Sequence, residues 1–277
     1  MANNLAKCGF NRGDKLAIIG DNRPELYFGI MATQMLGGVP VPIYQDSIAD
    51  EMVYILEHAE ISFAIVEDQE QVDKLLSIRD KLPNLDFVIY EDDRGLRNYE
   101  EHGLMSYAAA REQGFSFAAE NPKFVDEQIQ KTQGTDLAVM LYTSGTTGKP
   151  KGVMLSHANM WLGAVSVAHY LGMAEDDVTL AVLPLSFDYG QSQLLSTWYA
   201  GGCVVPLDYL FPRDVAKACT RHAVTTLAAV PPLWLQLTDV EWPAEAIGSM
   251  RRLTNSGGAL TLDLVRDLRG MFPQSQL

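Results

Sequence analysis

A chain of 277 residues is long enough to bury a large core and to form two lobes, and 47% hydrophobic with 20% charged residues is ordinary for a globular protein. The 35 acidic residues outnumber the 21 basic ones, and the net charge of −14 argues against nonspecific binding to nucleic acid or to anionic membranes. The three cysteines, Cys8, Cys203 and Cys219, are odd in number and widely spaced, which fits neither a disulfide framework nor a zinc site.

Strand-like runs alternate with helical patterns from the N-terminus to residue 90. The pattern predicts strands at 15–19, 39–42, 63–66 and 87–90, and helices from Pro24 to about Gly37, from Asp46 or Ser47 to Ala59, and over 69–81. Such alternation is typical of a parallel sheet flanked by helices. Residues 91–135 are charged and rich in turn formers, so we expect a surface excursion there.

The stretch 142–152 reads Tyr-Thr-Ser-Gly-Thr-Thr-Gly-Lys-Pro-Lys-Gly, directly after an apolar run at 137–141. Glycines allow the backbone to approach a ligand closely, hydroxyl groups offer hydrogen bonds, and lysines add positive charge, a combination that suits a polyphosphate. The common P-loop pattern does not fit, because only two residues separate Gly145 from Gly148 and a proline follows Lys149. Ser156 is placed to cap the next helix, and His157 after it is interpreted as a packed, uncharged imidazole.

The alternation resumes after this loop. It predicts helices at 156–170, 191–200, 212–222 and 262–271, and strands at 179–183, 203–206, 225–230 and 252–255. The expected fold class is therefore α/β, with two αβ subdomains whose mostly parallel sheets are flanked by helices. We place the first subdomain at 1–135, with the excursion 91–135, and the second, which carries the phosphate loop, at 136–277.

Two further segments follow predicted strands, where ligands bind in open α/β sheets. The first, 183–190, reads Leu-Pro-Leu-Ser-Phe-Asp-Tyr-Gly, and the second, 255–259, reads Asn-Ser-Gly-Gly-Ala. Asp188 is equally well explained as a helix N-cap, since aspartate is among the best capping residues. Any turn from a strand to a helix could resemble the second segment.

The loop at 142–152 resembles the signature of the adenylate-forming superfamily, which includes acyl-CoA synthetases, luciferases and the adenylation domains of peptide synthetases. The resemblance implies that Thr143 also contacts Mg²⁺ and that Phe187 forms a wall of the acyl pocket, with Asp188 and Tyr189 in the substrate site. The Ser-Phe-Asp form resembles amino-acid-activating members, in which the aspartate faces the substrate ammonium. The ATP-binding residues implied are Thr143, Ser144, Gly145, Thr146, Thr147, Gly148 and Lys151, and those against adenine and the acyl pocket are Gly257, Gly258 and Ala259.

By this resemblance, the parent protein activates a carboxylic acid with ATP and Mg²⁺, forms an acyl-adenylate, and transfers the acyl group to the thiol of CoA or of a carrier protein. A fatty acid is the expected substrate. An amino-acid-type enzyme that uses Asp188 as the ammonium anchor, and a noncatalytic nucleotide-binding remnant, are the alternatives.

The family's magnesium-binding glutamate and the small C-terminal domain with its catalytic lysine have no counterpart before Leu277. We therefore expect an N-terminal-domain fragment, also incomplete at its N-terminus, that is inactive by itself, and we assign no catalytic residue. The N-terminus lacks the apolar core of a signal peptide and no apolar run has transmembrane length, so the expected location is the cytoplasm.

Overall fold

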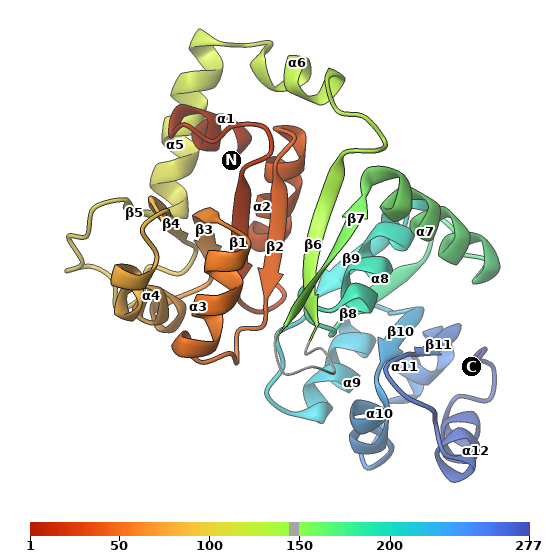
Figure 1. Cartoon of the computed structure of the whole chain (residues 1–277). Helices are drawn as coiled ribbons and strands as arrows, with labels where there is room; N and C mark the ends of the chain where they lie inside the picture. The colour runs from red at the N-terminus through yellow and green to blue at the C-terminus, as the bar shows by residue number, and fades with distance from the viewer. Residues whose placement is uncertain (144–149) are drawn as a thin grey trace. The chain divides into compact units, whose positions relative to one another are not determined.

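The computed structural model describes residues 1–143 and 150–277 of the chain. Two compact units, residues 1–159 and 160–277, each consist of helices packed around parallel strands (Figure 1). The α/β class predicted from the alternation of strands and helices is confirmed.

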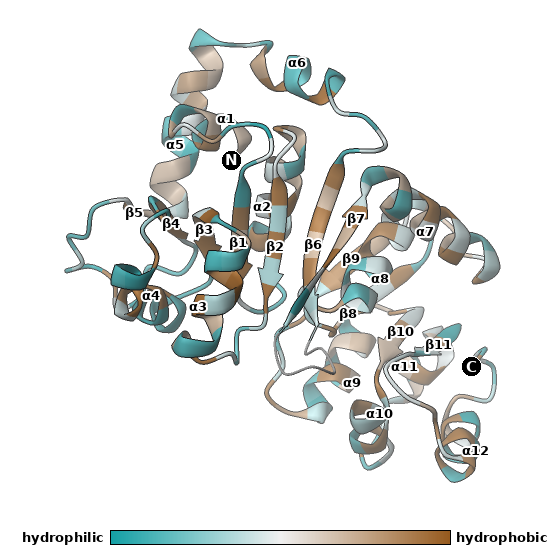
Figure 2. Ribbon diagram, viewed as in Figure 1, coloured by the Kyte–Doolittle hydropathy of each residue, from teal (hydrophilic) through white to brown (hydrophobic). Residues whose placement is uncertain are grey.

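The first unit contains a five-stranded, fully parallel sheet with the order β2-β1-β3-β4-β5. Its strands are β1 (Lys15–Ile19), β2 (Val39–Ile43), β3 (Ile61–Val66), β4 (Phe87–Tyr90) and β5 (Leu104–Ser106). Strands β1, β2 and β3 are buried along nearly their whole length, as expected for a sheet covered on both faces. Figure 2 shows the hydrophobic colour gathered on these strands.

Local sequence signals explain where the helices of the first unit begin and end. Pro24 occupies the first turn of α2, and Gly37, with φ of +72°, follows the end of that helix. Asp68 caps α4 by accepting a hydrogen bond of 3.2 Å from the Gln71 amide. The helices are α1 (Ala2–Lys7), α2 (Pro24–Met35), α3 (Ala49–His58), α4 (Gln69–Ser77), the 3-10 helix η1 (Arg79–Lys81), α5 (Tyr107–Glu120) and α6 (Phe124–Gln130).

An antiparallel hairpin completes the first unit. Strand β6 (Leu137–Thr143) pairs with β7 (Lys151–Ser156), so residues 144–149 connect two strands. The sequence had suggested that they connect a strand and a helix. Ser156 accepts a hydrogen bond of 3.2 Å from the Asn159 amide, which confirms its predicted capping of α7 (His157–Tyr170).

The second unit contains a four-stranded parallel sheet with the order β11-β10-β8-β9. Its strands are β8 (Val178–Ala181), β9 (Cys203–Pro206), β10 (Thr226–Ala229) and β11 (Arg252–Asn255). Besides α7, its helices are α8 (Asp188–Tyr199), α9 (Pro212–Arg221), α10 (Pro231–Thr238), α11 (Ala244–Ser249) and α12 (Leu262–Met271). Trp234 and Phe272 are the largest side chains fully buried in its core.

Residues 91–135 are more regular than the expected surface excursion. They contain β5, which extends the first sheet, and α5, whose Tyr107, Ala110 and Gly114 are buried. A Cβ atom on Gly114 would lie 3.2 Å from the backbone nitrogen of Asn4, so the glycine allows α5 to pack closely against α1.

The division between the units falls at Asn159/Met160, later than the expected 135/136. The reason is that Met140 and Tyr142 of β6 belong to the same hydrophobic core as Val41 and Ile43 of β2. Strands β6 and β7 are therefore part of the first unit. All three cysteines are unpaired. None of the helices in residues 1–143 and 150–277 is both long and apolar enough to cross a membrane.

Candidate functional site

The hairpin brings the two ends of the phosphate-loop segment together. Thr143 is the direct partner of Lys151 in the register of β6 and β7, and both side chains are exposed. Among the residues that the structure describes, Lys151 forms no ion pair, so its ammonium is available to an anion. The other predicted phosphate-binding residues lie outside the described residues: Ser144, Gly145, Thr146, Thr147 and Gly148.

A partly buried contact anchors the strand that leads to Thr143. The Tyr142 hydroxyl lies 2.6 Å from Nδ1 of His58 on α3, and the ring of Tyr54 stacks on His58 with centroids 5.4 Å apart. Burial, with a smaller effect of Tyr54, raises the pKa of Tyr142 to about 12, so this phenol stays protonated at neutral pH. A Cβ atom on Gly152 would lie 3.3 Å from the Tyr142 ring, so glycine leaves room for that ring.

A cavity of about 490 Å³ in the first unit adjoins both Thr143 and Pro150. It carries two carboxylates, Asp50 and Glu51, of which Asp50 is paired with Lys81 at 2.8 Å. Among the described residues that line it, this cavity therefore adds no positive charge to Thr143 and Lys151. Its remaining walls are Pro42, Ile43, Tyr44, Ser47, Tyr54, Ile55 and Tyr142.

His157, directly after β7, is half-buried at the start of α7. Burial is the main cause that lowers its pKa, which favours the uncharged imidazole expected from the sequence.

In the second unit, the segments singled out by the sequence meet at the carboxyl ends of the sheet strands. Strand β9 is added on one side of β8, and the later strands β10 and β11 are added on the other side. The strand order therefore changes direction at β8. Ligands bind at such switch points in open α/β sheets. The segment 183–190 follows β8, and the segment 255–259 begins at the last residue of β11.

The structure brings Phe187 against the glycine turn. Gly257 has φ of +78°, which favours glycine, and a Cβ atom there would lie 3.2 Å from Val230 and 3.8 Å from the Phe187 ring. The Asn255 side chain spans the turn and donates a hydrogen bond of 2.8 Å to the Gly258 carbonyl oxygen. Ala259 is exposed.

Asp188 and Tyr189 differ in their surroundings. Asp188 is exposed and is the first residue of α8, one position after the N-cap residue Phe187, and its carboxylate accepts a hydrogen bond of 2.8 Å from the Tyr189 amide. A carboxylate in the first turn still favours the helix through its dipole. Tyr189 is half-buried, burial raises its pKa, and its hydroxyl donates a hydrogen bond to Oγ1 of Thr254.

Tyr189 also lines a cavity of about 810 Å³ in the second unit. Asn255 and Ser256 form part of its wall, whereas Asp188 does not. The sequence analysis did not identify most of the residues in this wall. One available signal was the spacing of Tyr189 and Ser192, which are three residues apart and therefore lie on one face of α8. The other lining residues are Val167, Tyr170, Leu171, Arg252, Leu253, Thr254, Leu260, Val265, Arg269, Gln276 and Leu277.

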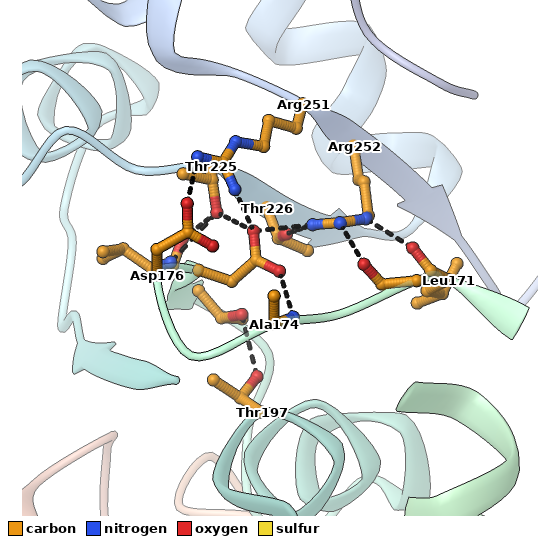
Figure 3. Close-up of polar contacts among 12 residues, drawn as sticks. Leu171, Ala174, Asp176, Thr197, Thr225, Thr226, Arg251 and Arg252 are labelled. Atoms are coloured by element: carbon orange, nitrogen blue, oxygen red, sulfur yellow. Dashed lines mark hydrogen bonds and ion pairs between the residues drawn. The ribbon is translucent and has the colours of Figure 1, made fainter. Parts of the chain in front are cut away.

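A buried ion-pair network lies at the amino-terminal ends of β8 and β11, at the end of the sheet opposite to these segments (Figure 3). Asp177 is fully buried and accepts hydrogen bonds from Arg252 at 2.7 Å and from the Thr225 hydroxyl at 2.8 Å. Arg252 also donates to the carbonyl oxygens of Leu171 and Gly172, each at 2.6 Å. The network joins the entry to β8, the entry to β10, the first residue of β11 and the end of α7, and so fixes the positions of the elements that form the cavity.

A family model described as AMP-binding enzyme matches residues 1–277. The chain belongs to this family. Among curated relatives, it is 31% identical over 250 residues to fatty acyl-CoA synthetase A of Dictyostelium discoideum, covering 86% of this chain and 35% of that protein. It is 30% identical over 267 residues to long-chain-fatty-acid–CoA ligase ACSBG1 of Homo sapiens, covering 91% of this chain and 35% of that protein. The chain thus spans about a third of the length of these relatives.

Solved structures of this AMP-binding family share the fold. The luciferase-like enzyme of the nonluminescent mealworm Zophobas morio superposes with a TM-score of 0.81 at 22% identity, covering 99% of this chain and 61% of that one. The inhibitor-bound N-terminal domain of FACL13 from Mycobacterium tuberculosis gives a TM-score of 0.78 at 21% identity, covering 97% of this chain and 64% of that one. At these identities the likeness concerns the fold alone.

Proposed function

We propose that this protein activates a carboxylic acid with ATP, forming an acyl-adenylate and pyrophosphate, and then transfers the acyl group to the thiol of CoA. The observation that carries the proposal is the pairing of Thr143 with Lys151 at the end of the β6–β7 hairpin where the two strands are connected. This pairing sets a residue with a hydroxyl group opposite one with an ammonium group where the phosphate-loop sequence begins and ends. The names of the relatives at about 30% identity support a fatty acid as the substrate.

In this proposal, Lys151 offsets negative charge on the β- and γ-phosphates, and the Thr143 hydroxyl donates a hydrogen bond to them. Bound ATP supplies the electrophilic α-phosphorus that the acid carboxylate attacks. A threonine hydroxyl is a hard oxygen ligand that suits Mg²⁺, but it supplies one ligand of the six that this ion takes, so Thr143 would hold Mg²⁺ only together with phosphate oxygens. The predicted residues at 144–148 would complete the phosphate site with backbone amides and hydroxyls.

The acid would bind in the second unit, where Phe187, Tyr189 and the Gly257 turn lie at the carboxyl ends of the strands. The cavity of about 810 Å³ is within the size range of small-molecule sites and has both apolar and hydroxyl-bearing walls. CoA is assigned as the acyl acceptor because the relatives that support the proposal are CoA ligases by name.

Substitution of Lys151 tests the phosphate role directly. Lys151→Ala should weaken ATP binding to the 277-residue chain about ten-fold or more, since a hydrogen bond to a charged group contributes about 1.5–3 kcal/mol. Isothermal titration calorimetry with ATP and Mg²⁺ measures this change. The matched control is Lys131→Ala, which removes one exposed positive charge outside the hairpin and should leave the affinity unchanged.

Activation itself is measured by acid-dependent exchange between pyrophosphate and ATP, with a panel of fatty and amino acids. The proposal predicts exchange with fatty acids in the protein that contains this sequence, and its loss in Lys151→Ala while the circular dichroism spectrum is retained. Normal exchange by a folded Lys151→Ala variant would show that Lys151 does not hold the phosphates.

A further inference from the structure

A second, much smaller cavity lies between α8 and the sheet of the second unit. Its volume is about 20 Å³, which is enough for one water-sized group. Its wall is rich in hydroxyl and amide side chains, which is unusual for the interface between a helix and a sheet. These polar side chains are Thr179, Tyr189, Ser192, Gln193, Ser196, Thr197, Thr226 and Thr254.

Most of these hydroxyl groups already have partners inside the wall. The Thr197 hydroxyl donates to Oγ1 of Thr179 at 2.8 Å, and the Tyr189 hydroxyl donates to Oγ1 of Thr254. The Ser196 hydroxyl donates to the carbonyl oxygen of Ser192 at 2.7 Å. These pairs satisfy one another and leave little capacity for a ligand.

Gln193 is the exception. Its side chain is 6% exposed, and both Oε1 and Nε2 are buried without a hydrogen-bond partner in residues 1–143 and 150–277. No other side chain that lines the small cavity has a buried, unpartnered nitrogen or oxygen within this described part of the chain. An unsatisfied buried polar group costs about 1–3 kcal/mol, so a partner for this amide would be strongly favoured.

The small cavity adjoins the larger one. Tyr189, Ser192 and Thr254 line both, as do Val167 and Leu171, so the two cavities share part of their wall and a ligand in the larger one would lie beside the small cavity next to Gln193. A group that fits there must be about the size of a water molecule, must donate to Oε1 and must accept from Nε2. A hydroxyl group meets all three requirements, whereas a methyl group meets only the first.

We propose that Gln193 determines specificity for an acid whose chain carries a hydroxyl group, and that it binds this hydroxyl with its side-chain amide. The inference rests on the proposed activation of a carboxylic acid and narrows its substrate class. A plain alkyl chain would offer neither amide atom a hydrogen-bond partner. A site built for a hydroxyl rejects an analogue that lacks it for this reason.

Calorimetry on the 277-residue chain tests the inference without requiring catalysis. The probes are hexanoate, octanoate and decanoate, each compared with its terminal hydroxy derivative. At the length that places the hydroxyl at Gln193, we expect the hydroxy acid to bind about ten-fold more tightly than the alkyl acid. Equal affinities at every length, or no binding of any of these acids, would overturn the inference.

Two variants on the same helix separate the ligand role from a structural role. Gln193→Met keeps the side-chain length and removes the unpartnered amide, so it should abolish the preference for the hydroxy acid and leave the melting temperature unchanged or raised. Gln191→Met removes a hydrogen bond of 2.8 Å from Nε2 to the Leu185 carbonyl oxygen, so it should lower the melting temperature and keep the preference. A Gln193→Met chain that still prefers hydroxy acids contradicts the proposed role.

The outcomes also distinguish this inference from the proposed function. If ATP binding depends on Lys151 but hydroxy and alkyl acids bind alike, only the role of Gln193 fails. If hydroxy acids bind preferentially through Gln193 but ATP binding does not depend on Lys151, the assignment of the phosphate site fails and the hydroxy-acid site remains.

Discussion

At the residue scale, the buried carboxylate of Asp177 is the strongest single electrostatic element of the second unit. Its only charged partners in the described residues are Arg252 at 2.7 Å and Arg251 at 3.3 Å. Removing one member of a buried pair leaves an uncompensated charge. We expect Asp177→Asn to lower the free energy of unfolding by about 3–5 kcal/mol, as measured by urea denaturation.

The neighbouring Asp176 provides the control. It is exposed and pairs with Arg251 at 2.7 Å, so Asp176→Asn should change the free energy of unfolding far less than Asp177→Asn does. Burial tends to raise the pKa of Asp177, but hydrogen bonds from Arg252, the Ala174 amide and Thr225 outweigh it and hold the pKa below its usual range. The stabilisation is therefore present above the unfolded pKa of about 3.9 and is lost as the pH falls through the folded value. Equal losses for the two variants would contradict this account.

Sequence reasoning found Asp188 and overlooked Asp177, and the difference has a physical reason. Asp188 stands in a recognisable segment after a strand, whereas Asp177 acquires its role only when Arg252, far along the chain, folds back onto it. Gln193 was overlooked similarly, because the absence of a hydrogen-bond partner is a property of the packed helix and not of its sequence. Short-range motifs are visible in a sequence, and long-range pairings are not.

At the scale of elements, helix α5 depends on a cap that can be removed selectively. The Ser106 hydroxyl accepts a hydrogen bond of 3.2 Å from the Ala109 amide at the start of the helix. Ser106→Ala should lower the free energy of unfolding by about 1 kcal/mol. Thermal or urea denaturation followed by circular dichroism measures the loss.

Ser116 on the same helix is the matched control. Its hydroxyl donates to the Glu112 carbonyl oxygen at 3.2 Å within the helix, a contact that adds little stability. Ser116→Ala should be neutral or slightly stabilising, because alanine has the higher helix propensity. If Ser106→Ala were as neutral as Ser116→Ala, the cap would not stabilise α5.

The elements that the sequence predicted well are those with sharp local signals. Helix α2 begins at Pro24 and is followed by Gly37, and α12 begins after Thr261, whose hydroxyl accepts a hydrogen bond of 3.3 Å from the Leu264 amide. Helix α5 was missed because Gly114 interrupts its pattern, and strand β7 because its pairing with β6 spans the loop. In both cases a partner distant in sequence determines the structure.

At the scale of the whole molecule, the α/β class and the predominance of parallel strands could be predicted, because alternation of buried strands and helices has few other solutions. The position of the unit boundary could not. Strand β6 is a continuous apolar run that would suit either core, and only packing against β2 assigns Met140 and Tyr142 to the first unit. The sequence predicted which segments contribute to the candidate site. The residues that line its cavity could be identified only in the folded sheet.

Three buried tyrosines and the half-buried Tyr189 make the stability of the molecule sensitive to alkaline pH. Burial is the main cause that raises the pKa of Tyr27, Tyr107, Tyr142 and Tyr189, to about 12 for Tyr107 and Tyr142, from an ordinary value near 10. Since the native state holds these protons more tightly, their stabilising contribution is complete below about pH 10 and is lost as the pH rises toward 12.

Each such tyrosine should make the free energy of unfolding fall by about 1.4 kcal/mol per pH unit within this window. Urea denaturation of the 277-residue chain at several pH values measures how steeply the free energy of unfolding falls with pH. Tyr107→Phe should make this slope smaller by the contribution of one tyrosine. Cys219, whose pKa burial raises to about 12, contributes equally to both proteins and cancels in the comparison. Tyr199→Phe is the control, because this ring is 46% exposed and its replacement should leave the slope unchanged. If Tyr107→Phe and Tyr199→Phe gave the same slope as the parent chain, the buried phenol of Tyr107 would not be the titrating group.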